Sequence, residues 1–213
     1  MTTKLPALKA LSLALLLSFG AAARAEITVF TSKAEFLAAI TGPVQSTDTF
    51  DNLAVAAYGE TMARMAGGVG YLVDGGIGSA IFGAGGTGGD FWLSTNNAGA
   101  TMAFSQFSQG VYALGGNFFG SDIAGSFIPN TKVVLSATDG AATRTFTLVN
   151  TTTDSFVGFI STQPIRAVTF HTAGANYWPT ANNMTLAVPE ADSYVMLLAG
   201  LLVMGWLIKQ NEG

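Results

Sequence analysis

The chain has 213 residues, 26 of them glycine, with no cysteine and a single histidine, His171. The lack of cysteine excludes a disulfide framework, a thiolate zinc site and a cysteine nucleophile, and one histidine excludes any site that needs two imidazoles. The net charge of −4 becomes −7 after residue 25, because three of the nine basic residues precede that point and all 13 acidic residues follow it. A nucleic-acid-binding protein would present a basic face, so nucleic acid is excluded as a partner.

The first 25 residues have the three parts of a secretory signal peptide. Two lysines precede an apolar run over residues 10–19, and Ala23 and Ala25 form a small-x-small cleavage pattern. The run is too short to span a bilayer easily, which favours a signal peptide over an N-terminal membrane anchor. We therefore expect the general secretion machinery to export the chain and signal peptidase to cleave it before Glu26.

Apolar and polar residues alternate along most of residues 26–187, the pattern of half-buried β-strands. A capping box of Ser32 and Glu35 predicts one helix, which ends at Gly42 and Pro43. Many short strands with one early helix favour a mainly β fold, an antiparallel β-sandwich of jelly-roll type with one short N-terminal helix. We expect strands over residues 27–30, 47–50, 59–65, 91–95, 101–107, 111–119, 131–137, 143–149, 156–161, 167–172 and 184–188.

A glycine-rich segment covers residues 75–89, with eight glycines in fifteen positions. A phosphate-binding loop would need a fixed glycine spacing at the start of a helix and a lysine after it, and neither is present. We therefore expect a flexible surface loop here.

Two tryptophans of the domain lie beside loop signals and suggest a carbohydrate-binding surface. A pair of asparagines follows each one, at residues 96–97 after Trp92 and at residues 182–183 after Trp178. Apolar faces of sugar rings stack on aromatic side chains, and the amides could bond to hydroxyl groups. The alternative is that both tryptophans belong to the hydrophobic core, where most aromatic residues of a sandwich lie.

Acidic residues are scattered through the domain and allow two further hypotheses. Asp48 and Asp51, beside Asn52, could donate oxygen ligands to Ca²⁺, or they could form a solvated turn. Glycoside hydrolysis needs two carboxylates that face one cleft, but most acidic residues, such as Asp122 and Asp139, lie beside turn residues. No Gly-x-Ser-x-Gly motif accompanies the single histidine, which indicates a structural role for that side chain.

The last 26 residues are organised differently from the domain. Val188, Pro189 and Glu190 precede an apolar stretch over residues 194–208, which as a helix would cover roughly 22 Å of a hydrocarbon core about 30 Å thick. This arrangement, over residues 188–213, resembles a PEP-CTERM sorting signal. The resemblance implies that an exosortase recognises the tripeptide while a transmembrane helix holds the chain in the inner membrane. An ordinary C-terminal membrane helix is the alternative.

The domain is also similar to other PEP-CTERM ectodomains, at residues 49–53, 156–159 and 165–170, and some of those have a galactose-binding-like topology. The sequence favours a non-enzymatic exported protein of the cell surface or extracellular matrix. The family resemblance implies a Gram-negative envelope or biofilm rich in exopolysaccharide as its setting. The first alternative is a carbohydrate-binding module that uses Trp92 and Trp178, and the second is a secreted hydrolase. No cofactor is expected apart from the Ca²⁺ ion considered above.

Overall fold

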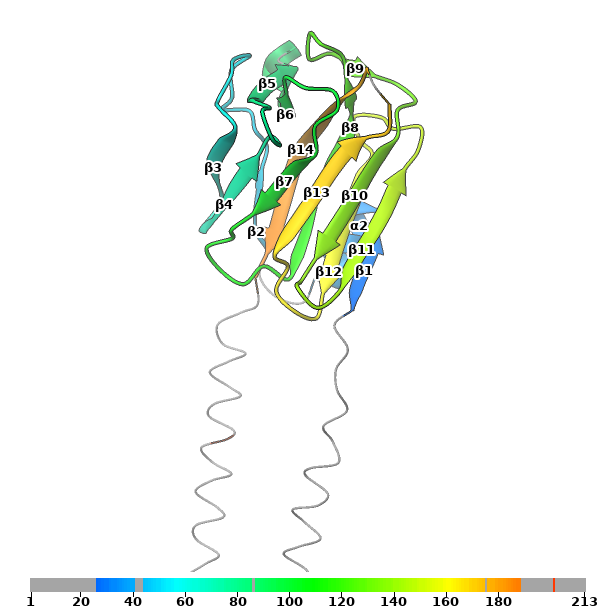
Figure 1. The fold of residues 1–213 in the computed structure, drawn as a ribbon. Coiled ribbons are helices and arrows are strands. Elements are labelled where there is room, and N and C mark those ends of the chain that lie inside the picture. Colours follow the sequence, from blue (N-terminus) through cyan, green and yellow to red (C-terminus); the bar gives the residue numbers. More distant parts are fainter. Residues whose placement is uncertain (1–25, 41–43, 86, 175, 189–200, 202–213) are drawn as a thin grey trace, which may run out of the picture.

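Two antiparallel β-sheets pack face to face in the computed structural model, which describes residues 26–40, 44–85, 87–174, 176–188 and 201 (Figure 1). The main path of the eight-stranded sheet runs, in spatial order, through β1 (Ile27–Phe30), β12 (Phe156–Ser161), β8 (Ala113–Ser121), β14 (Trp178–Ala187), β6 (Phe91–Thr95) and β5 (Ile81–Gly85). Two short strands extend it, β2 (Val44–Asp48) beside β14 and β9 (Phe127–Ile128) beside β8. The six-stranded sheet runs through β11 (Thr143–Leu148), β10 (Val133–Thr138), β13 (Ala167–Thr172), β7 (Met102–Ser105), β4 (Val69–Asp74) and β3 (Thr61–Ala66).

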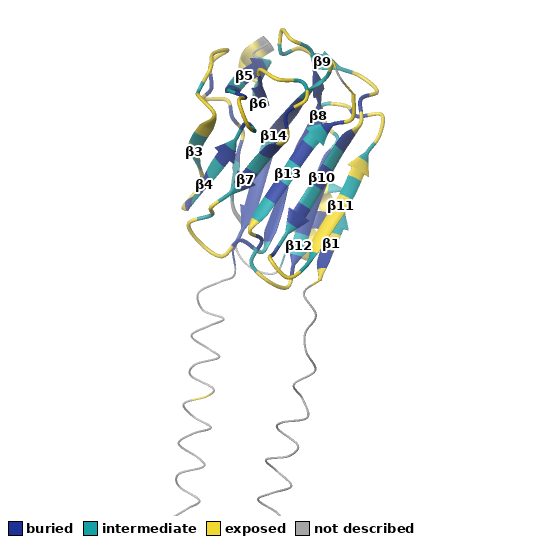
Figure 2. Cartoon of the chain, in the orientation of Figure 1, coloured by how far each residue is buried: buried dark blue, intermediate teal, exposed yellow. Residues whose placement is uncertain are grey.

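The hydrophobic core lies between the two sheets. Alternate residues of each strand point into it, as in β4, where Val69, Tyr71 and Val73 are buried between half-buried neighbours. The buried positions form dark bands on the facing strands (Figure 2). Phe104 and Phe118, from opposite sheets, both pack against Phe170 at the centre. All strand pairs among the described residues are antiparallel, so the expected mainly β, antiparallel sandwich is confirmed.

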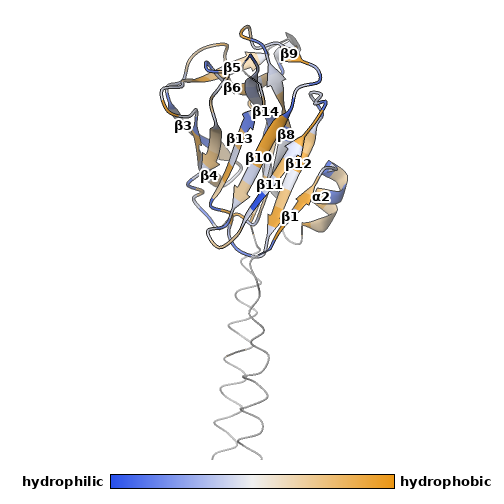
Figure 3. Cartoon of the chain, turned by 45° about the vertical axis from the view of Figure 1, so that its right-hand side comes forward, coloured by the Kyte–Doolittle hydropathy of each residue, from blue (hydrophilic) through white to orange (hydrophobic). Residues whose placement is uncertain are grey.

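One short helix, α2 (Lys33–Ala39), covers the outer face of the eight-stranded sheet beside β1 and β12 (Figure 3). Its start is the predicted one, since the Ser32 side chain accepts a hydrogen bond from the backbone N–H of Glu35. The fully buried Phe36 rests on glycines of the sheet, and a Cβ at Gly158 would lie only 2.3 Å from its ring. The helix ends at Ala39, before the predicted stop, which lies outside the described residues.

The predicted strands over residues 27–30, 91–95, 156–161 and 167–172 have the same bounds in the structure. Several other predictions need correction at their ends. The strand predicted over 47–50 is β2 and ends at Asp48, because Phe50 adopts a left-handed backbone with φ of 62°. The strand predicted over 184–188 is the end of β14, which begins at Trp178 and contains a register shift that breaks its alternation.

The expectation of a flexible loop over residues 75–89 is wrong in its second half, where β5 forms an edge strand paired with β6. The glycines there allow close approach of other groups to the backbone. A Cβ at Gly83 would lie 2.1 Å from the carbonyl oxygen of Ala54, and one at Gly85 would lie 2.8 Å from the Trp92 ring. Strands β4 and β9 were also missing from the predicted set.

The first strand begins and the last strand ends at the same end of the sandwich (Figure 1). Trp178 starts the ten-residue strand β14 at the opposite end, about 30 Å from Ala187 at 3.3 Å per residue. The predicted signal peptide, with Ala23 and Ala25, and the sorting residues Pro189 and Glu190 lie outside the described residues. Within the described part of the chain, no helix is both long enough and apolar enough to cross a bilayer.

Candidate functional site

A cleft of about 370 Å³ lies at the end of the sandwich where β14 begins. Its lining comes from β5, the end of β6, the loop between β8 and β9, and Trp178. Trp178, which is half-buried, pairs with Ser121, the residue before Asp122, and both Trp178 and Asp122 line the cleft. We call this site the Trp178 cleft.

The loop between β8 and β9 is held over β5 by its own carboxylate. One oxygen of Asp122, Oδ1, accepts hydrogen bonds from the backbone N–H groups of Ala124 (2.9 Å) and Ser126 (2.8 Å). The carbonyl of Gly125 then accepts one from Gly85 of β5 at 3.1 Å. Gly125 has φ of 79°, and a Cβ there would lie 2.8 Å from that of Ala84, so only glycine fits this approach. The loop therefore forms a fixed wall of the cleft.

Polar groups of the Trp178 cleft retain free hydrogen-bonding capacity. The second carboxylate oxygen of Asp122, Oδ2, has no partner among the described residues. Asn96 accepts a hydrogen bond from the Ala80 N–H at 2.9 Å through its side-chain oxygen, which leaves its NH₂ group unpaired within the same part of the chain. Thr95 also lines the cleft, and its buried hydroxyl has no protein partner there. An aromatic ring, a free acceptor and a free donor thus share one cleft.

Trp92, the other predicted platform residue, lies outside the residues that line this cleft. Its ring packs edge-to-face on Phe119, with centroids 4.9 Å apart, and Gly85 approaches the indole face. The indole N–H is buried without a partner among the described residues. The two tryptophans therefore do not share one platform, and only Trp178 belongs to the cleft.

The four asparagines considered with the tryptophans also differ in whether they line the cleft. Only Asn96 lines the cleft, although its sequence position had associated it with Trp92. Asn97 donates to the Ser79 hydroxyl, and its oxygen accepts from a backbone N–H in the same turn. Asn182 donates to Asp90 at 2.9 Å and accepts from the backbone N–H of Asn183. The side chains of Asn97 and Asn182 therefore have structural partners, and Asn183 is bonded through its backbone N–H. Asp122 is the cleft residue that the sequence interpretation had assigned to a turn alone.

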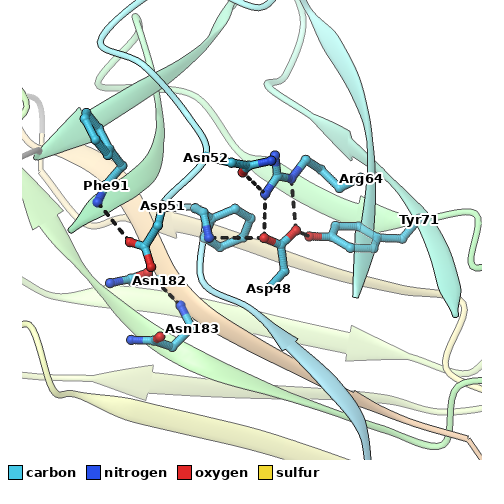
Figure 4. A network of polar contacts seen from close by, with 9 residues as sticks. Asp48, Asp51, Asn52, Arg64, Tyr71, Phe91, Asn182 and Asn183 are labelled. Carbon is cyan, nitrogen blue, oxygen red and sulfur yellow. Dashed lines mark hydrogen bonds and ion pairs between the residues drawn. The ribbon is translucent and has the colours of Figure 1, made fainter. Parts of the chain in front are cut away.

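A second cleft, of about 580 Å³, contains Asp48, Asp51 and Asn52, the residues considered for Ca²⁺. Both oxygens of Asp48 are occupied by donors (Figure 4). Arg64 donates to Oδ1 at 2.5 Å and to Oδ2 at 2.9 Å, and the Tyr71 hydroxyl donates to Oδ2 at 2.5 Å. Asn52 accepts from the same guanidinium at 2.9 Å. We call this arrangement the Asp48 cluster.

Burial and charge set the ionisation of the Asp48 cluster. Burial, followed by the negative charge of Asp48, raises the pKa of Tyr71 well above its usual value. Burial alone would lower the pKa of Arg64, but the hydrogen bond and charge of Asp48 outweigh that effect and raise it. Asp48 and Arg64 form a buried ion pair, with side chains only 5% and 10% exposed.

Asp51 lines the same cleft as Asp48 but has a different hydrogen-bond partner. Its carboxylate accepts a hydrogen bond from the backbone N–H of Phe91 at 3.3 Å and is drawn apart from the Asp48 cluster in Figure 4. Among the described residues, no three histidine or acidic side chains gather as a metal site. His171 lies on β13 opposite Val134 of β10, within the six-stranded sheet.

No protein-family model matches the chain, and no curated protein does. Among solved structures, it resembles the CBM22-1 xylan-binding domain of Paenibacillus barcinonensis Xyn10C, with a TM-score of 0.40, 15% identity, and coverage of 72% of this chain and 99% of that one. It also resembles TmCBM61 in complex with β-1,4-galactotriose, with a TM-score of 0.37, 16% identity, and coverage of 55% and 87%. An exo-β-1,3-galactanase from Phanerochaete chrysosporium has a TM-score of 0.33, 13% identity, and coverage of 62% and 29%. At these values the matches define no family for the chain.

Proposed function

We propose that this chain is an exported cell-surface protein whose β-sandwich binds polysaccharide in the Trp178 cleft. The observation that carries the proposal is that the half-buried indole of Trp178 shares one cleft with the free Oδ2 of Asp122 and the free NH₂ of Asn96. A sugar ring offers an apolar C–H face for an aromatic ring and hydroxyls that both donate and accept hydrogen bonds. The three side chains match those needs in kind.

Binding fits the cleft better than hydrolysis does. Asp122 is the single acidic side chain among the described residues that line it. A glycosidase places two carboxylates across one scissile bond, one to donate a proton and one to act as base or nucleophile. The Asp48 cluster supplies no substitute, because both oxygens of its carboxylate are bound by Arg64 and Tyr71. The non-enzymatic function is therefore the one proposed.

The sorting scheme belongs to the same proposal and is supported by the geometry of the domain. Signal peptidase would release the chain before Glu26, and an exosortase would recognise Val188, Pro189 and Glu190 while residues 194–208 span the inner membrane. Both attachment points lie at the end of the sandwich opposite Trp178. A chain held there would present the cleft away from the membrane, toward the exopolysaccharide of a Gram-negative envelope or biofilm.

Affinity electrophoresis of the detergent-solubilised full chain in gels that contain xylan, β-1,4-galactan or β-glucan tests the binding. We expect one of these polymers to retard the wild type, and Trp178→Ala to weaken that binding by about tenfold or more, equivalent to at least about 1.4 kcal/mol. Met65→Ala is the matched control, since Met65 is an exposed apolar residue (65%) beside the Asp48 cluster. Retardation by no polymer, or equal retardation of Trp178→Ala, would contradict the proposal. Release of reducing sugar would favour a hydrolase.

Intact-mass analysis of material recovered from the surface of the producing bacterium tests the sorting. We expect a mature protein that starts at Glu26 and ends near Pro189. A Glu190→Ala variant should accumulate in the inner membrane with its C-terminal residues still attached. Surface material that retains residues 194–208 would count against exosortase processing and favour an ordinary membrane anchor.

A further inference from the structure

The Trp178 cleft contains one formal charge, and that charge is negative. Asp122 is the only charged side chain among the described residues that line the cleft, and Oδ1 of its carboxylate is fixed by two backbone hydrogen bonds. Ile123 and Val55 also line the cleft, and these apolar residues are 84% and 63% exposed. A ligand in the cleft therefore meets a carboxylate that cannot easily move away.

Among the described residues, no basic side chain lines the cleft to offset this carboxylate. The described residues include five basic side chains, and none of them lines the cleft: Lys33, Arg64, Lys132, Arg144 and Arg166. Arg64 is held by Asp48 in the other cleft, and Arg166 donates to the backbone carbonyl of Asp139 at 3.2 Å. The nearest charge to a bound sugar is then the unpaired oxygen of Asp122.

We propose that the Trp178 cleft selects uncharged polysaccharides and rejects polyuronates, and that Asp122 sets this selectivity. The inference rests on the proposed function and names its substrate class. A neutral sugar hydroxyl can donate to Oδ2 in a charge-assisted hydrogen bond, which is stronger than a bond between neutral groups. A uronate carboxylate at the same position brings two like charges within a few ångströms and finds no arginine or lysine to compensate.

Asp122→Asn isolates the charge from the shape of the loop. The asparagine oxygen can still accept the backbone hydrogen bonds of Ala124 and Ser126, so the wall of the cleft is kept. Asp139→Asn is the matched control, because Asp139 holds the turn after β10 in the same way, with Oδ1 accepting from Ala141 and Ala142. It removes one negative charge at the opposite end of the sandwich, and therefore separates a local effect from an effect of net charge.

The test compares polymers that differ only in charge: β-1,4-galactan and β-1,4-glucan, each with its C6-oxidised, carboxylated counterpart. Affinities of the full chain are measured at about 10 mM and about 150 mM salt, which changes the Debye length from about 30 Å to about 8 Å. For the polymer that binds, we expect the oxidised form to bind about tenfold more weakly at low salt, with a smaller difference at high salt. Asp122→Asn should reduce that difference to threefold or less, whereas Asp139→Asn should leave it unchanged.

Equal binding of the neutral and oxidised polymers by the wild type would overturn the inference, as would an unchanged difference in Asp122→Asn. The polysaccharide-binding proposal would survive either result if Trp178→Ala still abolished binding of the neutral polymer. Failure of the wild type to bind any of the four polymers, together with no binding to xylan, would defeat both proposals. The two failures are therefore distinguishable.

Discussion

The Trp178 cleft and the cleft with the Asp48 cluster both contain a carboxylate, but the two carboxylates differ in how many hydrogen bonds they accept. In the Asp48 cluster the carboxylate accepts four hydrogen bonds, from Arg64 twice, from the Tyr71 hydroxyl and from the backbone of Phe50. In the Trp178 cleft the carboxylate of Asp122 accepts two, both on one oxygen. The difference supports a structural role for the first cleft, where Asp48 of β2 bonds to β3 and β4, and the ligand-binding role that we propose for the second.

Asp139 provides an intermediate case that supports this interpretation. Its Oδ1 accepts two backbone hydrogen bonds, as that of Asp122 does, and its Oδ2 accepts a third from the Ser161 hydroxyl at 2.9 Å. Asp139 is also more deeply buried, with 5% of its surface exposed. Each of these two carboxylates accepts two backbone hydrogen bonds on Oδ1, and they differ at Oδ2, which is paired in Asp139 and unpaired among the described residues in Asp122 of the Trp178 cleft.

The largest effect is expected when the buried ion pair is broken. Arg64→Ala leaves the Asp48 carboxylate buried without its cation, and removal of one partner of a buried pair costs about 3 to 5 kcal/mol. Urea denaturation followed by tryptophan fluorescence should show this loss in the free energy of unfolding. The polysaccharide affinity of the folded variant, measured without urea, should remain unchanged, because Arg64 does not line the Trp178 cleft.

Arg144 is the matched control for that experiment, since it lies on β11 with its side chain exposed. Arg144→Ala should change the free energy of unfolding by less than about 0.5 kcal/mol, as is usual at exposed positions. A similar loss in both variants, or a small loss in Arg64→Ala, would remove the structural role assigned to the Asp48 cluster.

Tyr71→Phe should have a smaller effect on the same cluster. At neutral pH it removes a hydrogen bond to a charged acceptor, and the expected loss in the free energy of unfolding is about 1.5 to 3 kcal/mol. Burial, then the charge of Asp48, raises the pKa of Tyr71, so above pH 10 the unfolded tyrosine loses its proton while the folded one keeps it. The unfolded state then binds fewer protons, and stability falls as the pH rises.

The variant makes this alkaline effect measurable. Since Tyr71→Phe has no phenol at this position, its free energy of unfolding should fall less steeply than that of the wild type between pH 10 and 11.5, by up to about 1.4 kcal/mol per pH unit. Parallel slopes in the two proteins would contradict the raised pKa. The absorbance of tyrosinate at alkaline pH should report the ionisation of Tyr71 as well. We expect one phenol of the wild type to ionise only when the chain unfolds.

The elements of this fold were predictable from sequence wherever local pattern and tertiary environment agreed. Strands β1, β6, β12 and β13 were predicted with the bounds that the structure has, and Ser32 with Glu35 correctly marks the start of α2. The glycine-rich strand β5 was not predicted, because its sequence was interpreted as a loop. In β5, glycines allow Ala54 and the Trp92 ring to approach the backbone, and this composition is indistinguishable in sequence from that of a mobile loop.

The sites were less predictable, because sheet topology assembles them from distant segments. Trp178 meets Asp122 only because β14 pairs with β8, at a separation of more than fifty residues, and no local motif records that pairing. Asp48 similarly meets Arg64 and Tyr71 across 16 and 23 residues. Sequence could identify Trp178 as a candidate platform residue, but not the acceptor beside it.

Asp139→Asn should have a modest effect on stability that depends on pH. The backbone hydrogen bond from Ala142, supported by Ala141 and Ser161, lowers the pKa of Asp139 in the folded state. A lowered pKa contributes stability above the unfolded value of about 3.9, and the contribution disappears as the pH falls through the folded value. We therefore expect a lower urea midpoint than wild type at pH 7 and converging midpoints below about pH 4. In Asp122→Asn the oxygen that accepts the two backbone hydrogen bonds is kept, so the urea midpoint of this variant at pH 7 should lie closer to that of the wild type.

The smallest effect is expected at Trp92. Trp92→Phe loses part of a ring that packs on Phe119, but it also removes an indole N–H that is buried without a partner among the described residues. These contributions oppose one another, so the free energy of unfolding should change by less than about 1 kcal/mol. Polysaccharide affinity should stay within about twofold of wild type, an equivalent of about 0.4 kcal/mol. A tenfold loss of affinity in Trp92→Phe, with folding intact, would instead extend the binding surface over β6 and restore a platform built from both tryptophans.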